Sequence, residues 1–218
     1  MKGLLIKDFK LMKNQKNFFF IMIFIAAAML FAEFESTFVV SYFTMIASMF
    51  VLSTISYDEY DNGYAFLFSM PFSRTSYVKE KYVFSILVGG GAWLLSVVLS
   101  GILITIRNPQ ISVMDWLPID LLYICIVLLF AAVMIPVQVK FGGERGRVAL
   151  LLTVGVAVLG SMGVIKLLEI LQVDLDAVLA SMCTMNMMQI GGAAGIFSVV
   201  LLAISYRISC RVMKNKEF

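Results

Sequence analysis

The sequence predicts an all-α integral membrane protein with six transmembrane helices, and three observations lead to this fold class. Hydrophobic residues make up 61% of the 218 residues, and the mean hydropathy of +0.96 lies outside the range of soluble proteins. Apolar runs recur to the C-terminal end of the sequence, whereas a secretory signal would be a single short run. Basic residues flank these runs. We therefore expect one transmembrane domain over residues 1–218.

Each expected span is an apolar run that meets or approaches the roughly 20 residues a helix needs to cross the hydrocarbon core. The expected spans are Phe18–Ala32, Phe38–Ile55, Tyr82–Ile106, Leu117–Val139, Val148–Ile165 and Ile190–Tyr206. The expected layout is an elbow helix (1–17), spans 1 and 2 (18–56), a loop (57–77), spans 3 and 4 (78–139), an inner loop (140–147), span 5 (148–165), an outer segment (166–189), span 6 (190–212) and a tail (213–218).

The lysines and arginines predict the orientation, because positive residues that flank spans are retained in the cytoplasm. With the N-terminus inside, Arg107 and Lys166 alone fall outside, and the other fifteen of the seventeen basic residues fall inside. The inner ones are Lys2, Lys7, Lys10, Lys13, Lys16, Arg74, Lys79, Lys81, Lys140, Arg145, Arg147, Arg207, Arg211, Lys214 and Lys216. We expect both termini in the cytoplasm.

Two segments are expected to lie at the membrane surface. The outer segment contains Glu169, Asp174 and Asp176, and a crossing there would place the basic tail outside, so it is expected to be re-entrant or interfacial. In residues 1–17 the five lysines fall on one half of a helical wheel, and the other half carries leucine and methionine. This pattern favours an amphipathic elbow helix over a solvated basic leader.

Several function classes are disfavoured. The sequence has no histidine, which excludes a histidine-based zinc site and a serine–histidine dyad. The run "GSMG" at 160–163 therefore indicates helix packing rather than a protease, and "GGGAW" at 89–93 is likewise expected to be a packing or flexible point. We expect no catalytic residue, no metal and no cofactor.

Ion coupling and nucleotide binding by this chain are also disfavoured. The acidic residues Glu33, Glu35, Asp115 and Asp120 fall near the outer ends of expected spans, whereas coupled transporters place such groups near the bilayer midplane. No G-x-x-x-x-G-K-[ST] loop occurs. The net charge of +3 is too small to indicate nucleic-acid binding.

The loop 57–77 combines acidic, aromatic and basic residues between two spans. Acidic residues at 58, 59 and 61, an apolar turn at 66–68 and the stop at Pro71 predict a short helix from Asp58 to Phe68. Ser73 or Thr75 can cap the following helix. The physical pattern alone is equally compatible with a docking surface and with an aromatic belt in the interface.

An acidic residue, a glycine, a hydrophobic turn and then "MPFSRTSYVKEKY" together resemble the first cytoplasmic loop of ABC-2 type ABC transporter permeases. The start "MKGLLIKDFKLMKNQK" resembles their amphipathic N-terminus. This resemblance implies a coupling helix that rests in a groove of a separate ATPase subunit. The residues implied in coupling are Asp58, Glu59, Tyr60, Asp61, Asn62, Gly63, Tyr64, Phe66, Leu67 and Phe68. The chain is also similar to the smaller permeases that export phenol-soluble modulins.

The resemblance implies a non-catalytic permease subunit of an exporter in a bacterial plasma membrane. Its implied partners are an ATPase subunit, a second identical or similar permease, the lipid bilayer, and an amphipathic peptide or lipid-like cargo. The inner loop "KFGGERGR" at 140–147 is a minor candidate contact. The alternative is a membrane component that needs no nucleotide, such as a channel, an immunity protein or a sensor.

Overall fold

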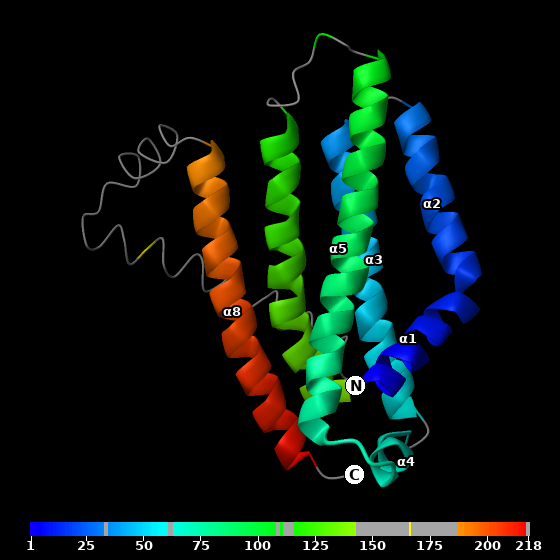
Figure 1. Cartoon of the computed structure of the whole chain (residues 1–218), viewed down its shortest axis with the longest axis vertical. Helices are drawn as coiled ribbons and strands as arrows, with labels where there is room; N and C mark the ends of the chain where they lie inside the picture. The colour runs from blue at the N-terminus through cyan, green and yellow to red at the C-terminus, as the bar shows by residue number, and fades with distance from the viewer. Residues whose placement is uncertain are drawn as a thin grey trace.

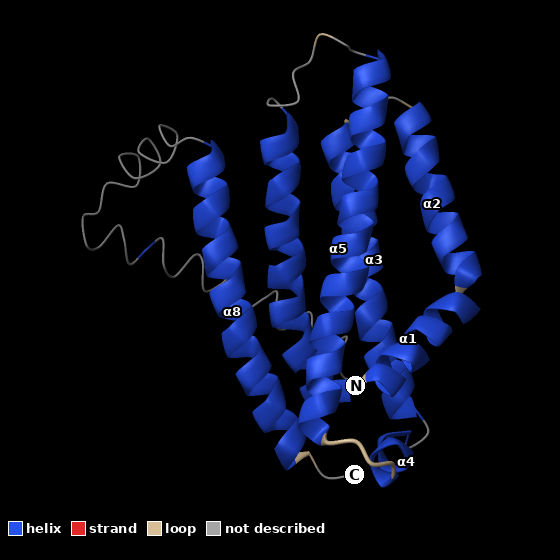
Figure 2. Cartoon of the chain, viewed as in Figure 1, coloured by secondary structure: helices blue, strands red, loops and turns tan. Residues whose placement is uncertain are grey.

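The described part of the chain is helical throughout (Figure 2). The structure is a computed structural model that describes residues 1–32, 35–60, 63–107, 110, 116–142, 166 and 187–216. Its helices are α1 (Lys2–Asn14), α2 (Lys16–Phe31), α3 (Ser36–Glu59), α4 (Gly63–Ser69), α5 (Arg74–Arg107), the helix Trp116–Gly142, which is unlabelled in Figure 1, and α8 (Met187–Asn215). The predicted all-α class is therefore confirmed for these residues.

Four of the described helices are long and apolar enough to cross a membrane: α3, α5, Trp116–Gly142 and the Gln189–Asn215 part of α8. The pair α1 and α2, bent by 64° at the break between them, gives a fifth if it counts as one span. Alone, the sixteen-residue α2 reaches only about 24 Å at 1.5 Å per residue. The expected span 148–165 and most of the outer segment 166–189 lie outside the described residues.

The long helices run side by side (Figure 1). Helix α5 packs against α3 and also against α8, and α2 packs against α3. An aromatic pair lies in the contact between α3 and α5, where the ring centroids of Phe50 and Phe84 are 6.4 Å apart. Helix α5 therefore lies between α3 and α8 and contacts both.

Among the three successive glycines of α5, only Gly89 is required by close packing. A Cβ atom at this position would lie 2.6 Å from Cγ1 of Val127 and 2.8 Å from Oγ of Ser48. A Cβ at Gly91 would meet nothing within 4 Å. The expected packing role of the glycine run is therefore confirmed at Gly89, which lets the helix Trp116–Gly142 and α3 approach α5 closely.

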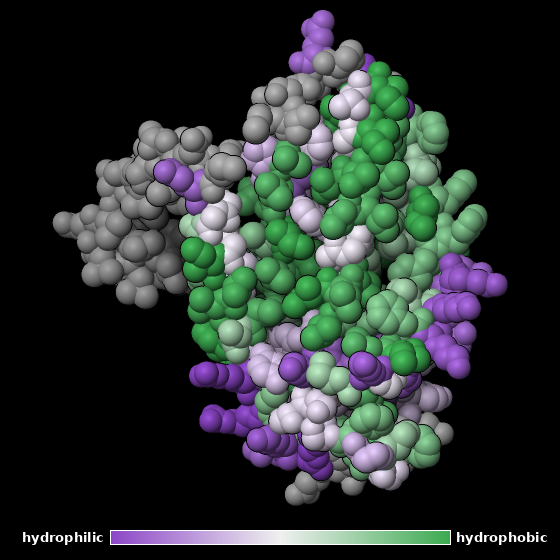
Figure 3. Space-filling model, viewed as in Figure 1, coloured by the Kyte–Doolittle hydropathy of each residue, from purple (hydrophilic) through white to green (hydrophobic). Residues whose placement is uncertain are grey.

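One end of the bundle collects α1, α4, the start of α5 and the end of α8, and we call it the α4 end (Figure 1). In Figure 3 hydrophobic side chains cover the middle of the molecule and hydrophilic ones gather at this end. A polar contact joins two helices beneath it: the hydroxyl oxygen of Tyr82 in α5 lies 2.6 Å from Oγ of Ser205 and 2.8 Å from Oγ of Ser209 in α8. All three side chains are buried.

Candidate coupling interface

The residues predicted to form one coupling helix belong to two helices and the link between them. Asp58 and Glu59 close α3, and Tyr60 follows them. Helix α4 contains Gly63, Tyr64, Phe66, Leu67 and Phe68, whereas Asp61 and Asn62 lie outside the described residues. The prediction of a helix beginning at Asp58 is therefore wrong, because Asp58 and Glu59 are the last residues of α3 and α4 begins only at Gly63.

Gly63 at the start of α4 is required by a contact within the chain. A Cβ atom there would lie 2.6 Å from the backbone oxygen of Asp58, so the chain can reverse direction at this point only without a side chain. The expected end of the short helix is confirmed, since α4 stops at Ser69, before Pro71. The expected cap is confirmed as well, because the backbone N–H of Ser76 donates to Oγ of Ser73 at 3.1 Å.

Helix α4 is attached to the bundle by one face and exposes the other. Tyr64 and Leu67 are buried, and the ring of Tyr64 meets the ring of Tyr77 in α5 edge-on at 5.8 Å. Burial raises the pKa of Tyr64 well above its usual value, so this phenol stays neutral. Phe66, in contrast, is 70% exposed, and Tyr60 is 80% exposed. The result is a fixed helix that presents aromatic surface at the α4 end.

A buried ionic cluster lies behind α4 and joins three helices. Lys81 of α5 has no exposed side-chain surface, and its ammonium group forms a hydrogen-bonded ion pair with Asp8 of α1 and an ion pair at 2.7 Å with Asp58 of α3. Lys81 also donates to Thr54 of α3 at 3.1 Å. Lys7 of α1 pairs with Asp58. Because the lysine is fully desolvated, its charge depends on these carboxylates.

The cluster bears on two expectations from the sequence. Asp58 was expected to take part in coupling to a partner, and the structure shows it paired with Lys81 within the chain. Asp8 was missed, although it falls on the leucine half of the predicted elbow helix, one turn after Leu4. Both Leu4 and Asp8 are buried. A carboxylate on the apolar half of such a helix was the signal that it has an internal partner.

A second set of contacts ties the C-terminal end of α8 to the same region. The guanidinium of Arg74, at the start of α5, donates to the backbone oxygens of Met213, Lys214 and Lys216 at 3.2, 2.8 and 2.7 Å. Lys216 forms an ion pair with Glu59 at 3.0 Å. A Cβ atom at Gly142 would collide with the carboxylate oxygens of Glu59, and Gly142 has a φ of +77°. Glu59 is therefore also held within the chain.

These features define a multi-pass membrane protein whose short helix at one end packs against the long helices α3 and α5. The chain matches the model of the family described as ABC-2 family transporter protein over residues 3–214, and it therefore belongs to this family. Members are membrane transport components that work with an ATPase subunit and are typically non-catalytic. A search of curated proteins and of solved structures gives no match.

Proposed function

We propose that this chain is the permease subunit of an ATP-driven exporter and that α4 is the helix through which it receives force from the ATPase. The observation that carries the proposal is the division of α4 into a buried face, with Tyr64 and Leu67, and an exposed one, with Phe66. A connector between two spans has no need of such an arrangement. A helix that must bind a partner and pass on its movement needs both faces.

The contacts of α4 supply a route for that movement. Tyr77 of α5 packs its ring against Tyr64 and, at 5.8 Å, against Phe68. The Tyr77 hydroxyl donates to Asp58 of α3 at 3.1 Å, which places it at the edge of the ionic cluster. A push on α4 therefore acts on α3 and α5 together, and through the cluster on α1. Tilting of these joined helices is the expected response to closure of an ATPase dimer.

The proposed orientation places the α4 end in the cytoplasm. It rests on the positive-inside rule applied to the sequence. The structure is consistent with it, because the basic residues Arg74 and Lys216 both lie at this end, where Arg74 donates to the backbone oxygen of Lys216 and Lys216 pairs with Glu59. In this orientation α1 is the elbow helix, and the ATPase reaches α4 from the cytoplasm. Phe66 and Tyr60 then supply the apolar contact, while Asp58 and Glu59 position the helix from within.

The cargo and the second permease follow from the same scheme. Six spans are too few to enclose a large substrate, so we propose that two permeases, identical or similar, face one another and carry the cargo between them. The predicted spans hold no central carboxylate or histidine, which favours an amphipathic or hydrophobic cargo, such as peptides of the phenol-soluble modulin kind, over ions. The proposed location is a bacterial plasma membrane.

The decisive experiment changes the exposed face of α4 without touching its anchors. In Phe66→Asp the apolar contact is lost and a desolvated charge opposes docking, so we expect at least tenfold weaker association, the equivalent of about 1.4 kcal/mol. Membrane abundance should stay normal, since the Phe66 side chain is 70% exposed. Association is measured by copurification of the ATPase subunit with tagged permease, and function by ATP-dependent uptake of a labelled amphipathic peptide into inverted vesicles.

Two matched variants control for this change. Phe66→Leu keeps an apolar side chain and should retain association. Phe141→Asp introduces the same charge at a 44% exposed phenylalanine in the minor candidate contact and should have the smaller effect. Wild-type association and uptake by Phe66→Asp would contradict the assignment of α4. Uptake that needs no ATP and no ATPase subunit would instead support the nucleotide-independent alternative.

A further inference from the structure

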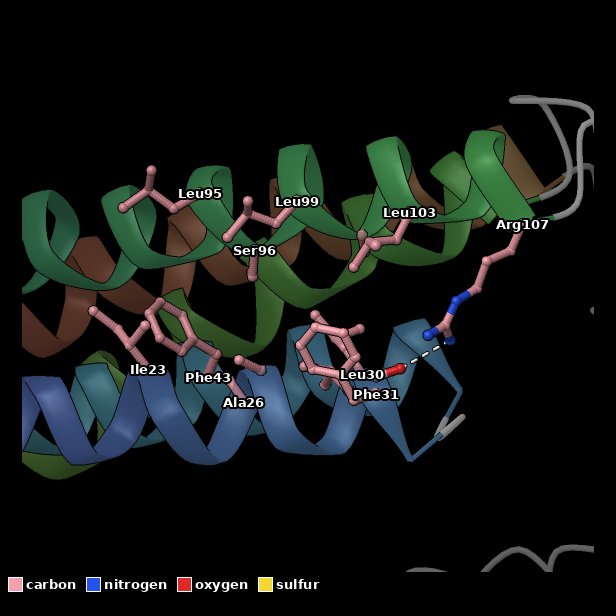
Figure 4. Close-up of a pocket in the computed structure, with 13 residues that line it drawn as sticks. Ile23, Ala26, Leu30, Phe31, Phe43, Leu95, Ser96, Leu99, Leu103 and Arg107 are labelled. Atoms are coloured by element: carbon pink, nitrogen blue, oxygen red, sulfur yellow. Dashed lines mark hydrogen bonds between the residues drawn. The ribbon is translucent and has the colours of Figure 1, made fainter.

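A crevice with an almost entirely apolar lining opens between α2, α3 and α5, in the half of the bundle away from α4 (Figure 4). Its volume is about 380 Å³, which lies within the size range of small-molecule sites. Ile23 and Leu30 of α2, Phe43 of α3, and Leu99 and Leu103 of α5 are among the side chains that line it. The crevice runs along the helices, so its shape suits a flexible, unbranched apolar chain.

A single charged side chain lies at one end of this crevice. Arg107, the last residue of α5, reaches across to α2 and donates from Nη1 to the backbone oxygen of Leu30 at 2.9 Å (Figure 4). This bond satisfies one of the last carbonyl groups of α2, which have no N–H donor within the helix. Within the described residues Arg107 has no carboxylate partner, and its side chain is exposed. Its remaining N–H donors are available to an anion at the level of the headgroups.

We propose that the crevice binds one acyl chain of an anionic phospholipid whose phosphate is held by Arg107. Arginine presents planar, paired N–H donors that match a phosphate, and its charge persists at any physiological pH. Position 107 follows directly on the apolar run that ends at Ile106, so the guanidinium lies at the depth of a phosphate while the lining lies at the depth of the acyl chain. Arg107 thus matches the phosphate of the lipid, and the apolar crevice matches its acyl chain.

The bilayer explains why the occupant is a lipid rather than another helix. Within hydrocarbon no hydrophobic force drives helices together, and their contacts rely on small residues that permit close approach. Small residues line part of the crevice, namely Ala26, Ala27, Ser96 and Ser100, but large side chains such as Phe31 and Phe43 border it as well and would keep a second helix from approaching closely. Left empty, these side chains would lose dispersion contacts. An acyl chain restores them without requiring a complementary protein surface, and Arg107 gives one class of lipid a longer residence.

The first experiment tests whether the charge of Arg107 holds the lipid. Wild-type and variant permease are reconstituted in phosphatidylcholine vesicles that contain a small fraction of phosphatidylglycerol, and this phosphatidylglycerol carries a photoreactive group in its acyl chain. Labelled peptides of α2 and α5 are measured by mass spectrometry. In Arg107→Gln we expect labelling by phosphatidylglycerol to fall about tenfold, because the neutral amide cannot replace the charge-assisted hydrogen bonds of the guanidinium to the phosphate. The control Lys166→Gln, the other basic residue predicted outside, should keep wild-type labelling.

The second experiment tests whether the lipid lies in the crevice, by substitution of two alanines that are neighbours in α2. Ala27 lines the crevice, whereas Ala28 is exposed and does not. Ala27→Phe should block labelling by phosphatidylglycerol and by an equivalent photoreactive phosphatidylcholine, and Ala28→Phe should leave both unchanged. Unchanged labelling in both Arg107→Gln and Ala27→Phe would overturn the proposal. So would crosslinks from α2 and α5 to a second permease copy in place of lipid. Arg107→Gln changes an exposed side chain, so its result does not depend on core packing.

Discussion

Removal of the buried ammonium group at position 81 should destabilise the protein strongly. Lys81→Met preserves most of the side-chain volume but leaves the carboxylate of Asp8 in a site with no exposed surface. Breaking a buried ion pair by removing one partner costs about 3–5 kcal/mol. Lys7 remains beside both Asp8, at 3.2 Å, and Asp58, so we expect the lower part of this range, about 3 kcal/mol.

The expected loss is measurable as a change in the midpoint of thermal unfolding. For a chain of this length each kcal/mol lowers Tm by about 2–4 °C, so Lys81→Met should lower it by about 6–12 °C. The assay is a temperature ramp of detergent-solubilised permease with a dye that fluoresces on reaction with thiols. Cys125 is a buried free thiol and Cys210 a partly buried one, so the rise in fluorescence reports opening of the helix Trp116–Gly142 and of α8.

Two comparisons separate the ionic contribution from a general loss of packing. Lys216→Met removes the lysine from a pair with Glu59 that is partly exposed, and such pairs contribute about 0–1 kcal/mol. The double variant Lys81→Met with Asp8→Leu removes the orphaned carboxylate, so its Tm should exceed that of Lys81→Met alone. If Lys81→Met is no worse than Lys216→Met, or if the double variant shows no recovery, the buried cluster does not stabilise the fold in this way.

Two further substitutions test the packing of α5. Gly89→Ala should lower Tm because its Cβ would collide with Val127 and Ser48, with a cost of about 1–3 kcal/mol from overpacking. Gly91→Ala, which meets open space, should leave Tm unchanged or raise it, and equal effects of the two would contradict the packing argument. Tyr82→Phe should cost about 1–3 kcal/mol, since it leaves two buried serine hydroxyls without their tyrosine partner, and a Tm within 1 °C of wild type by the thiol assay would argue against it.

The sequence was sufficient to predict the elements that depend on local composition and on the flanking residues. The apolar runs at 38–55, 82–106 and 117–139 lie within observed helices of the described chain. The stop before Pro71 and the cap at Ser73 were also predicted, because both act through their nearest backbone neighbours. The ABC-2 resemblance is confirmed by the family match over residues 3–214.

The sequence was less informative about the candidate coupling interface. Acidic residues suit the start of a helix as a general rule, but Asp58 and Glu59 close α3 because Lys81 and Lys216 supply partners for them there. These lysines lie 23 and 157 residues further along the chain, so no local pattern contains the pairing. Gly63 was expected to belong to the coupling helix, and in the structure its lack of a side chain makes room for the backbone of Asp58.

The sequence by itself determined that this protein is a helical membrane protein, because hydropathy and basic flanks act on each segment separately, and the motifs of its first loop and N-terminus gave the resemblance to the ABC-2 family. Only the tertiary structure decided which charges face inward. Asp58 and Lys81 look like surface residues in the sequence, yet they meet Asp8 beneath α4 because packing of α1, α3 and α5 removes all three from water together. Desolvation makes that pairing obligatory, and it depends on contacts between distant segments that no single stretch of sequence contains.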